Sequence, residues 1–149
     1  MITLFGRTLS GRVLVAGVGR VDRCDDGAGR VLARRLASVP GILALDCGDR
    51  LEDFTGDIAR LKPNMILVAD AVDLGATPGS VALLESSRLA PGGANSHGGS
   101  LAPAMDYLAK RTGAVVLLLA IQPSRVADGV GLSAEVGATV DVLADLFMG

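Results

Sequence analysis

Residues 12–19 read RVLVAGVG, a valine-rich apolar run that ends in Gly17-Val18-Gly19. A short run of this kind bounded by glycines predicts a buried strand. Residues 25–39 (DDGAGRVLARRLASV) follow, with apolar residues at helical spacing, acidic residues at the start and Pro40-Gly41 after the end. These signals predict a helix. Strand, glycine turn and amphipathic helix together indicate the first unit of an α/β protein.

The same reasoning extends along the chain and gives the order β-α-β-α-β-β-α-β-α. This order predicts a three-layer α-β-α sandwich around a mixed, mostly parallel five-stranded sheet. The third and fourth strands are joined by residues 71–79, a link shorter than the roughly 10–12 residues of a parallel crossover, so the fourth strand is expected to be antiparallel. Further strands are predicted at residues 42–46, 64–70, 80–85 and 114–121, and further helices at 51–61, 101–111 and 133–147.

Composition excludes several classes of protein. The chain has 149 residues, a net charge of −2, one histidine and two cysteines. This length fits a single domain, 1–149, in which residues 1–11 form an N-terminal extension without an assigned role. One histidine and two cysteines exclude the common zinc-finger and zinc-protease ligand sets. The charge and the scarcity of aromatic residues argue against a nucleic-acid partner. With no apolar run near the roughly 20 residues of a membrane span and no signal peptide, we expect a cytoplasmic protein without a membrane partner.

Aspartates gather at the predicted strand ends. Asp46 ends the second strand, Asp70 ends the third, and Asp25-Asp26 open the helix that follows the first. Acidic residues at a helix start are favourable in any protein, by about 0.3–1 kcal/mol each, so the pair alone does not indicate a site. However, the third strand is expected beside the first, and α/β proteins bind ligands where the carboxyl ends of such strands meet. The convergence of Asp26, Asp46 and Asp70 therefore predicts a site at this edge.

The single histidine, His97, lies in a long loop at residues 86–99. A loop histidine is usually an ordinary surface residue. This loop, however, is long enough when extended to return His97 from the end of an antiparallel strand to the aspartate edge. Two carboxylates and one imidazole form a three-ligand set for nickel, zinc or a similar divalent ion.

Other chemistries fit the sequence less well. Gly17-Val18-Gly19 begins a dinucleotide fingerprint, but Asp22 replaces its last glycine and the acidic helix start would repel a pyrophosphate. Ser100 follows two glycines as in a hydrolase nucleophile elbow, yet no strand leads into it, so we expect it to cap a helix. Cys24 and Cys47 are expected to be buried thiols, with roles as a soft metal ligand or nucleophile left open.

A series of short segments from residue 12 onward has a characteristic order and spacing: Gly17-Val18-Gly19, 25–29 (DDGAG), Asp46-Cys47-Gly48, 70–75 (DAVDLG), Pro78-Gly79, 96–101 (SHGGSL) and Ile121-Gln122-Pro123. In this pattern the chain resembles the nickel–iron hydrogenase maturation endopeptidases, especially the type serving hydrogenase 3 of formate hydrogenlyase. The resemblance implies removal of a C-terminal peptide from the hydrogenase large subunit precursor after nickel insertion. It also implies that the nickel comes with the substrate, that no organic cofactor is used, and that Asp26, Asp70 and His97 contact the metal.

Arg20 departs from the family pattern, which usually has asparagine there. An arginine at this position can weaken cation binding or bind the carboxylate of a protein tail. Asp46 is predicted to act behind the metal ligands, as a partner of His97 or of a bound water. The alternative from another class is a non-enzymatic metal- or nucleotide-binding protein on the same scaffold.

Overall fold

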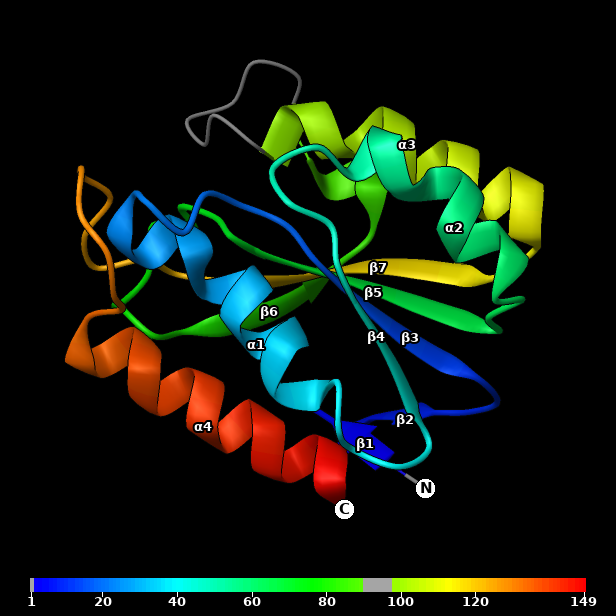
Figure 1. The fold of residues 1–149 in the computed structure, drawn as a ribbon, viewed down its shortest axis with the longest axis horizontal. Coiled ribbons are helices and arrows are strands. Elements are labelled where there is room, and N and C mark those ends of the chain that lie inside the picture. Colours follow the sequence, from blue (N-terminus) through cyan, green and yellow to red (C-terminus); the bar gives the residue numbers. More distant parts are fainter. Residues whose placement is uncertain (1, 90–97) are drawn as a thin grey trace.

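A five-stranded sheet with the order β4-β3-β5-β7-β6 lies at the centre of the molecule, with helices on both faces (Figure 1). The computed structural model describes residues 2–89 and 98–149, and only the backbone at 98–100. This is the predicted three-layer α/β sandwich. Its strands are β3 (Val13–Gly17), β4 (Ile42–Asp46), β5 (Met65–Ala71), β6 (Val81–Leu84) and β7 (Val115–Ile121).

The strand pairing confirms the predicted topology. β3 pairs in parallel with β4 on one side and with β5 on the other, and β5 pairs in parallel with β7. β6 pairs with β7 in the antiparallel sense, as its short link to β5 requires. In this register Gly17 lies opposite both Asp46 and Ala69, so Asp46 and Asp70 reach the same sheet edge on either side of β3. We refer to this edge as the carboxyl edge.

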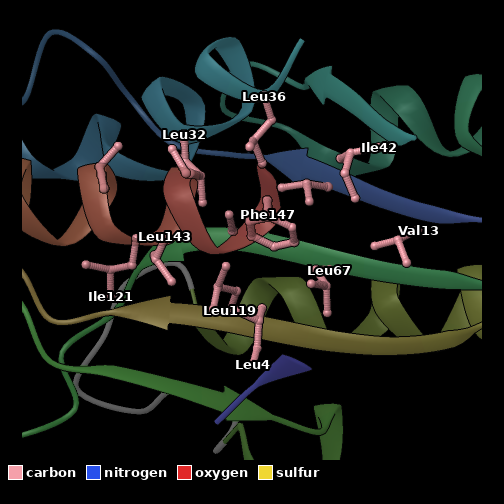
Figure 2. Packing of buried hydrophobic residues seen from close by; sticks show 14 of the residues in the cluster. Leu4, Val13, Leu32, Leu36, Ile42, Leu67, Leu119, Ile121, Leu143 and Phe147 are labelled. Carbon is pink, nitrogen blue, oxygen red and sulfur yellow. The ribbon is translucent and has the colours of Figure 1, made fainter. Parts of the chain in front are cut away.

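Alternation along the strands divides the core into two clusters. In β3, Val13 and Val15 face α1 (Ala28–Leu36) and α4 (Ala134–Met148), and Figure 2 shows this cluster around Phe147. Leu14 and Ala16 face the opposite layer, α2 (Thr55–Arg60) and α3 (Gly98–Thr112). Because both faces of the sheet are covered, the residues of β3, β4 and β5 are apolar except for Asp46 and Asp70 near the strand ends. In the described ranges no helix has the length and apolar character needed to cross a membrane.

Helix boundaries differ from the sequence prediction mainly at their starts. The predicted helices at 25–39 and 51–61 each open with a 3-10 turn, η1 (Cys24–Gly27) and η2 (Leu51–Phe54), before α1 and α2. A third 3-10 turn, η3 (Ser86–Arg88), follows β6. The prediction that Ser100 caps a helix is wrong, because α3 already begins at Gly98. Ser133 does cap α4, since its hydroxyl oxygen accepts a bond from the Val136 N–H at 3.4 Å.

The N-terminal residues form a hairpin of β1 (Ile2–Leu4) and β2 (Arg7–Leu9), for which the sequence analysis gave no element. Its two leucines, Leu4 and Leu9, are buried in the same cluster as Phe147. Strands of three residues are too short to show a hydrophobic period, which explains why the hairpin was missed. The segment assigned as an extension is thus packed onto the domain.

Candidate active site

The turn after β3 is held on both sides by its neighbours. The Val18 N–H donates to the Ala69 carbonyl of β5 at 2.9 Å, and the Gly19 N–H donates to the Gly48 carbonyl after β4, also at 2.9 Å. On the β4 side, the Cys47 N–H donates to the Gly17 carbonyl at 2.8 Å. These bonds bring the ends of three strands into one fixed arrangement at the carboxyl edge.

Two glycines allow η1 and α1 to approach the end of β5. A Cβ at Gly29 would lie 1.9 Å from the Ala69 carbonyl oxygen. A Cβ at Gly19, where φ is +137°, would lie 2.0 Å from the Asp26 carbonyl oxygen and 3.3 Å from Asp70 Oδ1. Because no side chain fits at either position, Asp26 can lie close to Asp70 across Gly19.

Asp70 is completely buried near the end of β5. Its Oδ1 accepts a bond from the Ala71 N–H at 2.8 Å, whereas its Oδ2 has no hydrogen-bond partner among the described residues. Burial, and after it the charge of Asp26, raises the pKa of Asp70 well above its usual range, against the smaller opposing effect of the Ala71 bond. A buried carboxyl with an unpartnered oxygen is suited to bind a cation or to exchange a proton.

Asp26 lies in η1 and is only 3% exposed. Its Oδ2 accepts a bond from the backbone N–H of Arg20 at 2.9 Å. The Arg20 side chain instead pairs with Asp22, at 2.8 Å between Nη2 and Oδ2. Arg20, which replaces the asparagine usual in the family, therefore binds Asp26 through its backbone N–H, while its guanidinium pairs with Asp22.

Asp46 is held by two arginines of α1. Arg30 Nε and Arg34 Nε lie 2.7 Å from its two oxygens, and the Gly48 N–H donates to Oδ1 at 3.2 Å. Burial acts to raise the pKa of Asp46, but these bonds outweigh it and hold the pKa below its usual value. Arg30 also reaches the Gly19 carbonyl, at 3.4 Å from Nη1. Asp46 is thus an ionised carboxylate linked through Arg30 to the turn between Asp26 and Asp70.

The predicted ligand His97 lies outside the described residues. The next residue, Gly98, begins α3, which runs back along the sheet and leads into β7, so it begins on the side of the carboxyl edge (Figure 1). In the ranges 2–89 and 98–149, no group of three or more histidine, cysteine or acidic side chains is arranged to hold a metal ion.

Both cysteines are free thiols near this edge. Cys47 is buried, and burial followed by the charge of Asp46 raises its pKa to about 12. Its Sγ lies 3.7 Å from the Leu45 carbonyl oxygen, as a weak donor. The expected buried thiol is confirmed for Cys47, whereas Cys24 is half-buried.

Sequence reasoning missed two functional side chains. Gln122, directly after β7, orders the loop that follows Asp70: its Oε1 accepts from the Leu74 N–H at 2.6 Å and its Nε2 donates to Asp73 at 3.3 Å. Asp25, which was interpreted only as part of a helix start, is fully buried and accepts bonds from residues near the other end of the chain. Gln122 belongs to the quoted Ile121-Gln122-Pro123 segment, but nothing local in the sequence indicates the partners of Asp25.

The chain has a doubly wound α/β fold, and its two buried carboxylates lie at the switch point, where proteins of this class bind ligands. The chain belongs to the hydrogenase maturation protease family, whose sequence model matches residues 28–149, and it is a peptidase. The hydrogenase 3 maturation protease of Escherichia coli strain K12 is 32% identical over 109 residues, which cover 71% of this chain and 69% of that protein.

Solved structures agree with this assignment. The NiFe hydrogenase maturation protease HycI from Thermococcus kodakarensis KOD1 superposes with a TM-score of 0.80 at 26% identity, covering 92% of this chain and 90% of that one. A crystal structure of a hydrogenase 3 maturation protease gives 0.79 at 27% identity, covering 90% and 87%. The family resemblance and the fold class inferred from the sequence are both confirmed.

Proposed function

We propose that this peptidase removes a C-terminal peptide from the large subunit precursor of a nickel–iron hydrogenase after nickel has been inserted. The observation that carries the proposal is the Asp26–Asp70 pair, in which a fully buried carboxylate has one oxygen without a partner among the described residues. Two adjacent carboxylates are costly to ionise together unless a cation joins them. The names of the E. coli and Thermococcus relatives support a hydrogenase as the substrate.

We further propose His97 as the third contact to the metal. It directly precedes Gly98, which begins α3 on the side of the carboxyl edge. Carboxylate oxygens with an imidazole nitrogen suit nickel, and three protein contacts leave positions open for the peptide or a water. The nickel is part of the substrate in this proposal, so neither a resident metal nor an organic cofactor is required.

The chemical role of the site follows from this arrangement. A metal ion held at the two carboxylates would polarise the scissile carbonyl or a water. The raised pKa of Asp70, caused first by burial and then by Asp26, makes this side chain sensitive to an arriving cation, which would favour its ionised form. We propose that Asp46 supports the site from behind, with His97 or a bound water as its predicted partner and with Arg30 as its observed one. The two free cysteines support a reducing, cytoplasmic location.

The decisive experiment compares nickel-loaded and nickel-free precursor by intact mass after incubation with the chain. We expect a C-terminal cut only in the nickel-loaded precursor. Asp26→Asn, Asp70→Asn and His97→Ala should each abolish the cut, whereas Asp141→Asn, which alters an exposed carboxylate on α4, should not. Normal trimming by all three site variants would refute the site assignment, and equal trimming of nickel-free precursor would refute the nickel requirement.

A further inference from the structure

Asp25 makes an extensive set of hydrogen bonds at the carboxyl edge. Its buried carboxylate accepts four hydrogen bonds: from the backbone N–H groups of Ser124 (2.9 Å), Arg125 (2.9 Å) and Ser133 (2.7 Å), and from the Ser133 hydroxyl (2.8 Å). All four donors lie in the segment after β7 or at the start of α4. Four donors around one side chain suit a carboxylate, which only accepts hydrogen bonds.

Backbone bonds and one ion pair join the same two segments. The Asp25 N–H donates to the Arg125 carbonyl, and the Cys24 N–H donates to the Gly129 carbonyl, both at 3.0 Å. Arg23 also pairs with Asp128 at 2.9 Å, but the Asp128 side chain is 95% exposed, so that pair contributes little. The Asp25 carboxylate is therefore the buried centre of the connection.

The geometry of η1 relates Asp25 to its neighbour. Successive side chains of a 3-10 turn point about 120° apart, since the turn has about three residues per revolution. With Asp25 fixed toward residues 124–133, Asp26 is turned toward Gly19 and the Arg20 N–H, which donates to it at 2.9 Å. Rotation of the turn would move both carboxylates together.

We propose that Asp25 is a positioning residue, which holds η1 against residues 124–133 and thereby fixes Asp26 against Asp70. The inference rests on the proposed function, because it assigns Asp26 to the reacting site. The proposal also assigns a role to residues 124–133, which follow the last strand in sequence, β7. This segment would determine the geometry of η1, about 100 positions earlier in the chain.

The first test measures geometry without activity. Asp25→Asn has the same shape but turns an amide N–H₂ toward backbone N–H donors, so it should release η1. We expect hydrogen exchange of the Arg20 amide to accelerate at least about tenfold, because that amide is bonded to Asp26. Asp128→Asn, which breaks only the exposed ion pair, should leave this amide unchanged. Wild-type protection of Arg20 in folded Asp25→Asn would overturn the proposal.

The second test separates positioning from substrate binding. With nickel-loaded precursor, Asp25→Asn should lower kcat at least about tenfold while KM changes less than about threefold, because displacement of a reacting group affects the chemical step. A loss confined to KM, or a wild-type kcat, would overturn the proposal. If Asp25→Asn does not fold, Ser133→Ala answers the same question, since it removes one of the four bonds together with the α4 cap. A lower kcat with faster Arg20 exchange and unchanged exchange within α4 supports the proposal, and wild-type kcat and Arg20 exchange overturn it.

Failure of the proposed function gives a different result. If the unchanged chain does not cut nickel-loaded precursor, the assigned substrate is wrong, whatever the variants do. The exchange of the Arg20 amide still decides whether Asp25 fixes Asp26.

Discussion

Asp26 and Asp70 both lie against Gly19, whose missing side chain leaves room for the Asp26 carbonyl oxygen and for Asp70 Oδ1. Burial and the charge of Asp26 together keep the pKa of Asp70 well above its usual range. Such a pair destabilises the folded protein when both members are ionised, because neither charge is in water and the two repel. The pair is therefore expected to reduce stability in return for affinity toward a cation.

Asp70→Asn should make the protein more stable at pH 7 while abolishing processing. A carboxyl whose pKa is higher in the folded state binds its proton more tightly there than in the unfolded chain. The protonated group therefore favours folding below about pH 4, and this contribution to the free energy of unfolding is lost as pH rises through the folded-state pKa. Removal of the ionisable group should restore about 1–3 kcal/mol at pH 7 and much less at pH 4. Urea unfolding at the two pH values measures the difference, and a variant less stable than wild type at pH 7 would contradict this account.

Asp46→Asn should reduce both stability and processing. Its carboxylate is bound by Arg30, whose side chain is 19% exposed, and by Arg34, so the loss should exceed that for an exposed pair such as Arg35–Asp141, worth about 0–1 kcal/mol. If Asp46 supports the proposed metal contacts, its substitution should also lower the rate of precursor trimming, by about 10–100-fold. Asp141→Asn is the matched control for both measurements, and full trimming by Asp46→Asn would remove Asp46 from the site.

Gly29→Ala and Gly137→Ala should change stability in opposite directions. A Cβ at Gly29 would lie 1.9 Å from the Ala69 carbonyl oxygen, so α1 must move away from the sheet, and the variant should lose several kcal/mol or fail to fold. Gly137 lies within α4 with nothing within 4 Å of an added Cβ, so alanine there should gain about 0.5–1 kcal/mol. Thermal unfolding of the two variants tests the packing of α1 on β5, and equal shifts would contradict it.

Native Cys47 should resist alkylation. Its thiol is buried and its pKa is raised to about 12, so almost no thiolate exists at pH 8. Iodoacetamide at that pH should label the half-buried Cys24 first and reach Cys47 only after unfolding. Peptide mass mapping with and without urea distinguishes the two cysteines, and rapid native labelling of Cys47 would show that the loop after β4 opens.

The sequence predicted the sheet well because its strands are almost entirely apolar and the lengths of the links between them are informative. The short link at 71–79 was sufficient to predict the antiparallel β6, and strand ends were sufficient to bring Asp46 and Asp70 to one edge. Helix starts were less predictable, because a 3-10 turn such as η1 has the same acidic composition as the first turn of an α-helix.

Long-range polar partners could not be predicted. Asp46 was expected to support His97 or a bound water, and the structure shows it between Arg30 and Arg34 of α1. Asp25 resembled an ordinary helix start, since its four bonds come from residues that no local pattern connects with it. Such contacts depend on how the layers pack, which composition and periodicity do not encode.

The bond between Asp25 and Ser133 joins residues separated by 108 positions, and this separation affects how the protein is made. A nascent chain that has left the ribosome only as far as β7 has most of the sheet and both candidate carboxylates, but none of the four donors that hold Asp25. The start of α4 must be synthesised before η1 is fixed in place. The geometry proposed for Asp26 is therefore reached only after residues 124–133 have been added to the growing chain.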